Sequence, residues 1–460
     1  MNAVGHPPRA PAAGNRGVKR RALDREILRL AVPSLGALVA EPLFVLTDTA
    51  MVGHLGAQPL AGLGLASVML QTAIGLLVFL AYATTPLVAR RLGAGDTRGA
   101  HAAGIDGLWL ALGIGVLVFV LMAPLSPLVV GWFEAAPAVE FAALEYLTIA
   151  WWGIPGMLLM LAATGMLRGL QDARTPLLVA AAGFGANIVF NAVFIYGFGL
   201  GIAGSAIGTV IAQWGMAVAL IVVCVRHARA AGSELRPGRT GIEAAARSGS
   251  WLLLRTLSLR IALVTTVVVA TTMGTTELAA THVWFAVYSL LALALDALAI
   301  AGQALIGHGL GAAQIDRVHA ITRRLVGWGV LTGVVLAVLV GASIPLLTIA
   351  MTSDAAVRAT LPLALGILAI GLPLAGLVFV LDGVLIGAGD GRYLAWTGVL
   401  NLLVYLAVLP LAVGVVGGLA ALLTAFSFAY LGARAVTLGL RARGIAWIVT
   451  GAPASASAAR

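Results

Sequence analysis

Twelve stretches of mostly apolar residues divide this chain, and each is long enough to cross a lipid bilayer as a helix. A transmembrane helix needs about 20 predominantly apolar residues. The predicted spans lie near residues 27–52, 60–89, 105–130, 141–167, 176–196, 201–225, 248–271, 279–302, 323–349, 357–386, 393–413 and 417–439. Only 10% of the 460 residues are charged, against roughly 25% in a typical soluble domain. The sequence therefore predicts an all-α membrane protein.

The basic residues gather in the two terminal segments and in the even-numbered connections between the spans, such as Arg90 and Arg91 or Arg226 and Arg229. Cytoplasmic loops of membrane proteins carry an excess of Lys and Arg. This pattern explains the formal net charge of +10 without a nucleic acid partner. It predicts a multi-pass protein of the cell inner (plasma) membrane with both termini in the cytoplasm, which requires an even number of spans.

The second half of the chain repeats the first. Gly56 corresponds to Gly274, 218 positions later, and the same offset relates the segments 92–94 and 310–312, 101–102 and 319–320, and 153–155 and 371–373. A shift of four residues then pairs Asn187 with Asn401. Glycine, proline, histidine and aspartate that keep one spacing indicate two related halves.

Six spans per half give both halves the same orientation, so their symmetry axis should lie along the membrane normal, with a cavity between two six-helix bundles. Two lobes that rock about such a cavity provide alternating access. The predicted organisation is a cytosolic disordered tail at 1–26, an N-lobe at 27–225, a cytosolic linker at 226–247, a C-lobe at 248–439 and a cytosolic C-terminal tail at 440–460.

Charged residues at membrane depth are the first candidates for function, because each is costly unless it is paired or hydrated. Glu41 and Asp48 lie seven residues apart on one face of the first span. A carboxylate in a low-dielectric site takes up a proton more readily, and in its ionised form it can hold sodium. The alternative is that such a charge only pairs with another and fixes the order of the helices.

The second half contributes Asp296, Asp382 and Arg260 as C-lobe candidates. Glu41 and Arg260 occupy nearly equivalent repeat positions, so an ion pair between the lobes is one expectation. Arg255 is expected to extend to the cytoplasmic edge of the membrane.

Three neutral polar residues accompany Asp48 in the first half. Asn187 and Asn191 lie on one face of span 5, and Thr209 follows in span 6. Oxygen ligands beside one carboxylate suit Na⁺ or a hydrated proton, although hydrogen bonding between helices is an equal alternative. Pro33 lies within the first span, where a missing backbone hydrogen bond allows either a switchable bend or a static kink.

These residues together resemble the multidrug and toxic compound extrusion (MATE) family, in its DinF-like branch. The resemblance is carried by AVPSLGALVAEPLFVLTDTAMVGHLGAQPLAGLGLA at 31–66, GMLRGLQDARTP at 165–176, NIVFNAVFIYGFGLGIAGSAIGT at 187–209 and VLIGAGDGR at 384–392.

The resemblance implies twelve helices in two pseudo-symmetric lobes and a secondary active transporter, not an enzyme. Such a protein exports drugs or toxic organic compounds, cationic or amphipathic, in exchange for H⁺ or Na⁺ as the coupling ion and without a cofactor. By position, Pro33 matches the bending proline and Asp48 the cation-coupling carboxylate. Asn187, Asn191 and Thr209 match its partners, which would form any Na⁺ site. We expect a monomer.

Two departures from the family pattern favour proton coupling. Asn191 stands where relatives often have a second Asp, and Thr164 where they often have Asn, while Glu41 adds an acid to the same helix. The runner-up function is a flippase or exporter of lipid-linked or polysaccharide precursors, for which only Arg255 and Arg260 could hold a pyrophosphate. A membrane-embedded enzyme is the least favoured function, because the HExxH, DDxxD, P-loop and GxSxG patterns are absent from the sequence.

Overall fold

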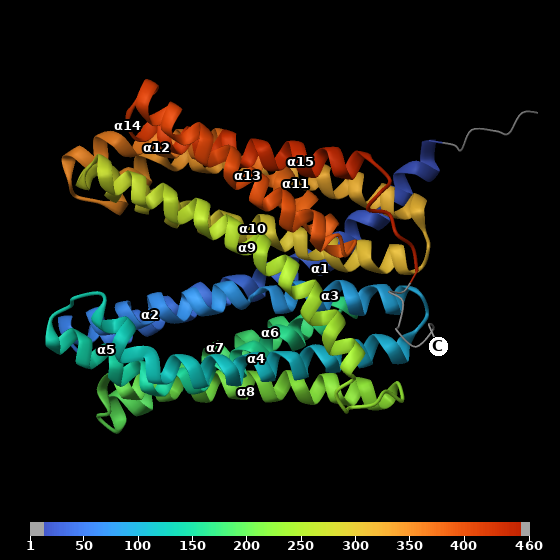
Figure 1. Ribbon diagram of the computed structural model, residues 1–460, viewed down its shortest axis with the longest axis horizontal. Coiled ribbons are helices and arrows are strands. Elements are labelled where there is room, and N and C mark those ends of the chain that lie inside the picture. Colours follow the sequence, from blue (N-terminus) through green and yellow to red (C-terminus); the bar gives the residue numbers. More distant parts are fainter. Residues whose placement is uncertain (1–12, 452–460) are drawn as a thin grey trace, which may run out of the picture.

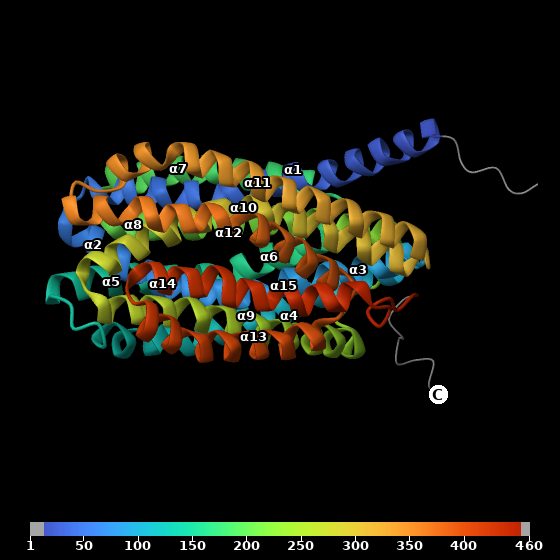
Figure 2. The same cartoon turned by 90° about the horizontal axis from the view of Figure 1, so that it is seen from above.

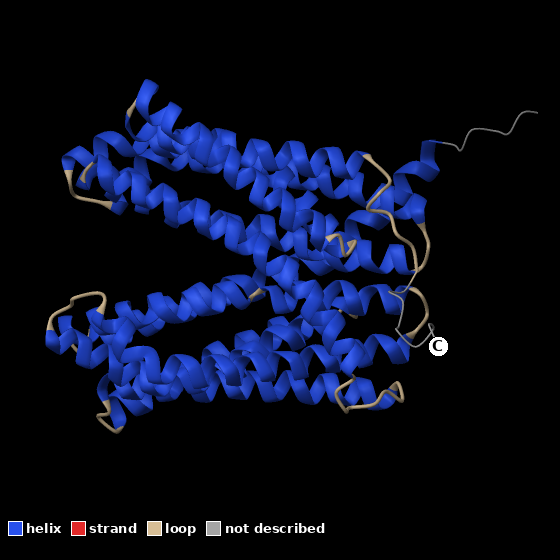
Figure 3. Cartoon of the chain, in the orientation of Figure 1, coloured by secondary structure: helices blue, strands red, loops and turns tan. Residues whose placement is uncertain are grey.

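The computed structural model describes residues 13–451, and within this range every regular element is a helix (Figure 3). The first lobe contains α1 (Ala13–Gly53), α2 (Ala57–Leu77), α3 (Phe79–Gly93), α4 (Thr97–Gly131), α5 (Pro137–Ala150), a 3₁₀ turn (Trp151–Gly153), α6 (Ile154–Gly169), α7 (Arg174–Asn191), a π-helical segment (Ala192–Gly197) and α8 (Gly201–Ala230).

The second lobe contains α9 (Arg239–Met273), α10 (Thr275–Gly311), α11 (Ile315–Met351), α12 (Ala355–Gly387), α13 (Gly391–Leu411), a π-helical segment (Ala412–Val416), α14 (Gly418–Thr424), a second π-helical segment (Ala425–Tyr430) and α15 (Leu431–Arg443). Two helices, α4 of the first lobe and α12 of the second, have aspartates at their N-terminal caps, Asp96 and Asp354 respectively. The side chains of these aspartates accept hydrogen bonds from backbone N–H groups in the first turn.

The described residues contain twelve helical spans that are long and apolar enough to cross a membrane, as the sequence predicts. Some spans are built from two consecutive helices: α2 and α3 form one, and α5 and α6 form another. The spans make two bundles, the N-lobe from α1 to α8 and the C-lobe from α9 to α15 (Figure 1).

Parts of the predicted N-terminal tail and of the predicted linker are helical in the structure. Residues 13–26 of the predicted disordered tail are helical, and the linker shortens to 231–238, because α8 continues to Ala230 and α9 begins at Arg239. A helix satisfies its own backbone hydrogen bonds and can therefore extend beyond the bilayer with polar side chains. Residues 1–12 and 452–460 of the two predicted tails lie outside the described residues.

The two lobes meet at one end of the molecule and diverge toward the other (Figure 1). The end where they meet also holds the start of α1 and the last described residues, and we call it the terminal face; the other end is the distal face. The N-terminal part of α1 projects from the bundle at the terminal face (Figure 2). There Asp24 pairs with Arg324 of α11, and Glu26 pairs with Arg317, so α1 is tied to the C-lobe.

The lobes approach closely at a glycine crossing of α3 and α10 at the terminal face. A Cβ atom on Gly93 would lie 2.0 Å from the carbonyl oxygen of His308, and one on Gly311 would lie 2.0 Å from that of Arg90. The two contacts are related by the repeat, since 93 and 311, like 90 and 308, differ by 218. The pseudo-two-fold axis therefore passes through this crossing, where the backbones touch.

The segment after α15 covers the same face. Trp447 is buried, and the Arg90 side chain donates to the carbonyl oxygens of Ala388, Val449 and Gly451. An arginine of the N-lobe thus holds the C-lobe and the C-terminal segment together, which closes the terminal face.

Candidate functional site

Asp48 lies near the distal end of α1, and its carboxylate is 4% exposed. It accepts hydrogen bonds from the Asn191 amide, from Ser205 Oγ at 3.1 Å, from Thr209 Oγ1 at 3.3 Å and from the Tyr146 hydroxyl at 3.4 Å. Within the described part of the chain, no arginine, lysine or histidine forms an ion pair with it. A buried carboxylate is thus held by neutral donors from three other helices.

The local backbone explains how these donors reach Asp48. Asn191 ends α7 at the point where the helix widens into π-helical turns, a feature that re-aims side chains and is frequent at functional sites. Gly208 of α8 faces it, and a Cβ atom there would lie 2.1 Å from Asn191 Oδ1. The absence of a side chain at Gly208 therefore gives the amide room to turn toward Asp48.

The structure brings together the predicted group of Asp48, Asn187, Asn191 and Thr209. Asn187 Nδ2 donates to Thr209 Oγ1 at 3.3 Å and to Asn191 Oδ1 at 3.4 Å, so it supports the residues that touch Asp48. Two members of the group, Ser205 and Tyr146, were not predicted from the sequence. Ser205 lies four residues before Thr209 and therefore on the same face of α8, which was an available signal.

Tyr146 carried no comparable signal, because it comes from α5 and reaches Asp48 only through the packing of the lobe. Pro33 lies inside α1, and α1 is helical on both sides of it. The bend proposed for this position stays a prediction.

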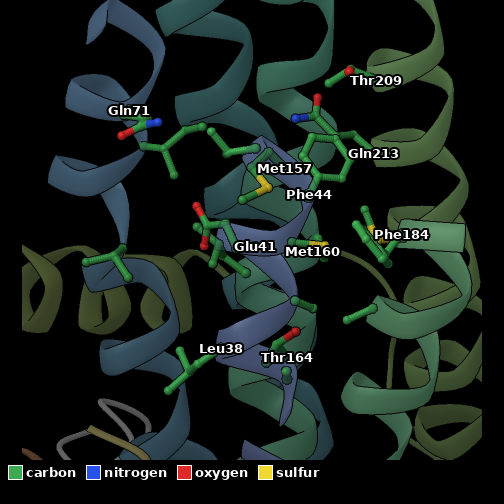
Figure 4. Close-up of a pocket in the computed structure, with 18 of the residues that line it drawn as sticks. Leu38, Glu41, Phe44, Gln71, Met157, Met160, Thr164, Phe184, Thr209 and Gln213 are labelled. Carbon is green, nitrogen blue, oxygen red and sulfur yellow. The ribbon is translucent and has the colours of Figure 1, made fainter. Parts of the chain in front are cut away.

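A cavity of about 220 Å³ lies inside the N-lobe beside this group, and we call it the N-lobe cavity. Its walls come mainly from α1, α2, α6, α7 and α8, and most of its lining is apolar, including Phe44, Met157 and Phe184 (Figure 4). Asp48 and Glu41 both line it, and Glu41 lies among the labelled lining residues in Figure 4. The cavity thus places two carboxylates of α1 beside an enclosed space for a small molecule.

The expected ion pair between Glu41 and Arg260 is absent among the described residues. Glu41 faces the N-lobe cavity, whereas Arg260 of α9 extends to α2, where its guanidinium lies against Gly75. Equivalent positions in two repeats are related by the symmetry axis and meet only when they lie on it. The repeat therefore shows that Glu41 and Arg260 occupy nearly equivalent positions, but it does not predict that their side chains touch.

The two C-lobe carboxylates have partners. Asp382 of α12 forms ion pairs with Arg255 of α9 and Arg434 of α15, so the expectation that Arg255 extends to the membrane edge is wrong. Asp296 of α10 accepts a hydrogen bond from the Tyr82 hydroxyl of α3 at 3.0 Å, which joins the two lobes. Asp382 is thus neutralised within its lobe and differs in kind from Asp48.

The C-lobe position equivalent to the Asp48 group has hydroxyl groups in place of the carboxylate and amide. Thr266 follows Asp48 by 218 residues, Tyr405 follows Asn191 by 214, and these two hydroxyls share a hydrogen bond of 2.7 Å. The rings of Trp284, Phe426 and neighbouring tyrosines pack around them. Both lobes keep the interhelical contact, but only the N-lobe carries a carboxylate there.

Comparison with known proteins gives one family. The family model MatE matches residues 33–193 and 255–413, one match in each half. Protein DETOXIFICATION 43 of Arabidopsis thaliana is 29% identical over 442 residues, covering 82% of this chain and 83% of that protein. DNA damage-inducible protein F of Escherichia coli is 29% identical over 294 residues, covering 63% of this chain and 64% of that protein.

The solved structures that are similar include the MATE transporter VcmN of Vibrio cholerae in a bent form. It has a TM-score of 0.85 and 22% sequence identity, with 92% of this chain and 98% of that chain covered. At this level of identity the likeness concerns the fold.

Proposed function

The chain belongs to the MatE family of efflux transporters, and on this premise we propose that it exports small organic compounds by antiport with H⁺ or Na⁺. It is a multi-pass membrane protein and not an enzyme. The finer statements below concern the coupling ion, the site and the orientation.

The observation that carries the proposal is the environment of Asp48. Its carboxylate is buried, lines the N-lobe cavity and is hydrogen-bonded only by neutral groups within the described residues. A buried charge without a partner of opposite sign is costly. A bound proton or sodium ion removes that cost, so Asp48 is the group of α1 that responds to ion occupancy.

The two states of Asp48 favour different contacts. The ionised carboxylate accepts hydrogen bonds from Asn191, Ser205, Thr209 and Tyr146, or shares their oxygens with Na⁺. The protonated group becomes a donor and no longer needs four donors around it. Ion binding therefore changes how firmly α1 is held against α7 and α8, and Pro33 gives α1 a place to bend.

Alternating access follows from the relation of the lobes. In this conformation the lobes meet at the terminal face and diverge toward the distal face (Figure 1). A rocking motion that separates α3 from α10 at the glycine crossing would open the terminal face and close the distal one. The distribution of basic residues predicts that both termini lie in the cytoplasm. With this orientation in the inner membrane, the conformation described here is outward-open. We propose that the protein acts as a monomer.

The test is transport into everted membrane vesicles of an organic cation, driven separately by a pH gradient and by a sodium gradient. Asp48→Asn should abolish drug resistance in a sensitive host and gradient-driven uptake while the protein still reaches the membrane. Asp316→Asn, an exposed carboxylate at the start of α11, is the matched control and should leave both unchanged. Normal uptake by Asp48→Asn would remove Asp48 from the mechanism.

The alternative of a flippase for lipid-linked precursors is not supported by the two arginines that the sequence suggested for it. Arg255 is neutralised by Asp382, and Arg260 lies against α2 rather than in the N-lobe cavity. Neither arginine is available to hold a pyrophosphate in this conformation.

A further inference from the structure

Arg168, near the end of α6, is a buried arginine without a partner among residues 13–451. Its side chain is 8% exposed, and its Nε atom has no hydrogen-bond acceptor. Within the described residues its guanidinium forms neither a hydrogen bond nor an ion pair. Arg168 nevertheless lines the N-lobe cavity, so its free donors border the space in which cargo would sit.

The guanidinium groups of the other buried arginines have acceptors, although the Nε atom of Arg90, like that of Arg168, has none. Arg255 and Arg434 pair with Asp382, and Arg90 donates to three backbone carbonyls. The charge of Asp296 acts on Arg168, but Asp296 accepts a hydrogen bond from the Tyr82 hydroxyl and forms no ion pair within the described residues. A buried guanidinium with free donors is costly, so Arg168 is not explained as one half of a structural pair.

The repeat shows that the fold does not need a charge at this position. Gly169 and Gly387 correspond in the repeat, so Arg168 corresponds to Ile386. Ile386 is 3% exposed and belongs to the hydrophobic core of the C-lobe. In the C-lobe an apolar side chain therefore occupies the position equivalent to Arg168. The N-lobe, which contains the cavity, has an arginine at this position.

The chemistry of the cavity limits what can satisfy Arg168. A guanidinium presents donors in a planar fork that matches a carboxylate, and it binds other oxyanions such as sulfonate. A cargo that occupies the cavity beside Arg168 must offer its free donors an acceptor, because leaving buried donors without one is costly. The cavity volume of about 220 Å³ lies below the range of roughly 300–1,000 Å³ that is usual for small-molecule pockets, which suits a compact cargo.

We propose that Arg168 is an anion-binding residue of the N-lobe cavity and that the cargo includes compact aromatic acids, whose carboxylate or sulfonate pairs with it. This inference rests on the proposed export function and deepens it. Glu41 and Asp48 line the same cavity, so a basic group elsewhere on the same molecule has acids to face. The cavity therefore suits a zwitterion, whose acidic group pairs with Arg168 and whose basic group faces the two carboxylates.

The experiment uses three fluorescent probes that share one naphthalene ring system: dansyl sulfonate, which is anionic, dansyl amide, which is neutral, and dansyl ethylenediamine, which is cationic. Each is titrated onto the full-length protein in lipid nanodiscs. The wild type should bind the sulfonate about 10- to 100-fold more tightly than the amide, the range expected of charge-assisted hydrogen bonds. Arg168→Gln should remove this preference and leave the amide within threefold.

The cationic probe gives a result of opposite sign. Arg168→Gln removes a repulsive charge and should tighten its binding, which a general loss of structure would not do. Arg168→Lys keeps the charge but not the planar fork and should retain part of the preference for the sulfonate. Arg174→Gln, an exposed arginine near the same loop, is the matched control and should behave as the wild type.

Equal affinities of the wild type for sulfonate and amide, equal weakening of all probes by Arg168→Gln, or no binding of the sulfonate overturns the inference. The export proposal is judged separately, by uptake of an organic cation in everted vesicles with Asp48→Asn as its test. Loss of that uptake in Asp48→Asn together with equal binding of the probes would leave export standing and refute the role of Arg168 alone.

Discussion

Replacing Gly311 with alanine should shift the transporter away from the conformation described here. A Cβ atom at this position would lie 2.0 Å from the carbonyl oxygen of Arg90, whereas ordinary contacts begin at 3.4 Å. The helices α3 and α10 would have to separate by about 1.4 Å, the difference between these distances. The obstructing atom belongs to the backbone and cannot rotate away, as a flexible side chain could.

The magnitude follows from the cost of overpacking. Inserting a methyl group into a closely packed contact costs roughly 1–3 kcal/mol. The cost falls on the conformation with a closed terminal face, because α3 and α10 separate when that face opens. A bias of this size changes the ratio of two conformations by roughly 5- to 150-fold. Gly93→Ala, the symmetry-related change, should act in the same direction.

The shift can be measured as a distance between spin labels on the distal ends of the two lobes. Phe133 of the N-lobe and Val415 of the C-lobe are exposed there, at 48% and 82%. Cys224 is the single cysteine and is replaced by alanine beforehand. Double electron–electron resonance should give a long distance in the parent protein and a larger population at short distance in Gly311→Ala.

Gly327→Ala is the control, since its Cβ atom would meet nothing within 4 Å and should leave the distance distribution unchanged. An unchanged distribution in both Gly93→Ala and Gly311→Ala, with folded protein, would refute the idea that the glycine crossing sets the balance between conformations.

Three further changes follow from the structure. Asn191→Asp places a second carboxylate beside Asp48 and should create sodium binding measurable by calorimetry; a variant that binds no more Na⁺ than wild type would argue against a cation site there. Asp382→Asn leaves two buried arginines without an anion and should destabilise the protein by roughly 3–5 kcal/mol, visible as a lower thermal midpoint in detergent; an unchanged midpoint contradicts this. Truncation after Arg443 removes two carbonyl acceptors of Arg90 and should speed amide hydrogen exchange at the end of α3, whereas unchanged exchange would show that the segment does not hold the terminal face closed.

Much of the fold was predictable from the sequence because its signals are local or periodic. A span of apolar residues identifies a membrane helix without knowledge of its neighbours. The repeat register identified the two lobes, since glycines and prolines at fixed spacing mark equivalent turns and crossings. The termini of the helices were less predictable, because helices such as α1 and α9 continue into water with polar residues that a hydrophobicity pattern excludes.

The candidate site was predictable only in part. Asp48, Asn187 and Asn191 were identified because charges and amides at membrane depth are rare, and the periodicity of a helix indicates which of them share a face. The partner Tyr146 could not be found in this way, because its contact with Asp48 joins residues 98 positions apart. Its role depends on how α5 packs against α2 and α8 within the lobe.

By itself the sequence determined the number of spans, the two-fold relation of the halves and the presence of a carboxylate on the first helix. Each of these features can be recognised from residues that are neighbours in the sequence or are separated by a fixed number of positions. The tertiary structure decided which charges are neutralised: Asp382 has two arginines, Asp48 has only neutral donors, and Arg168 faces a cavity with no partner among the described residues. Electrostatic interactions depend on distance and burial in three dimensions, and neither quantity is set by spacing along the chain.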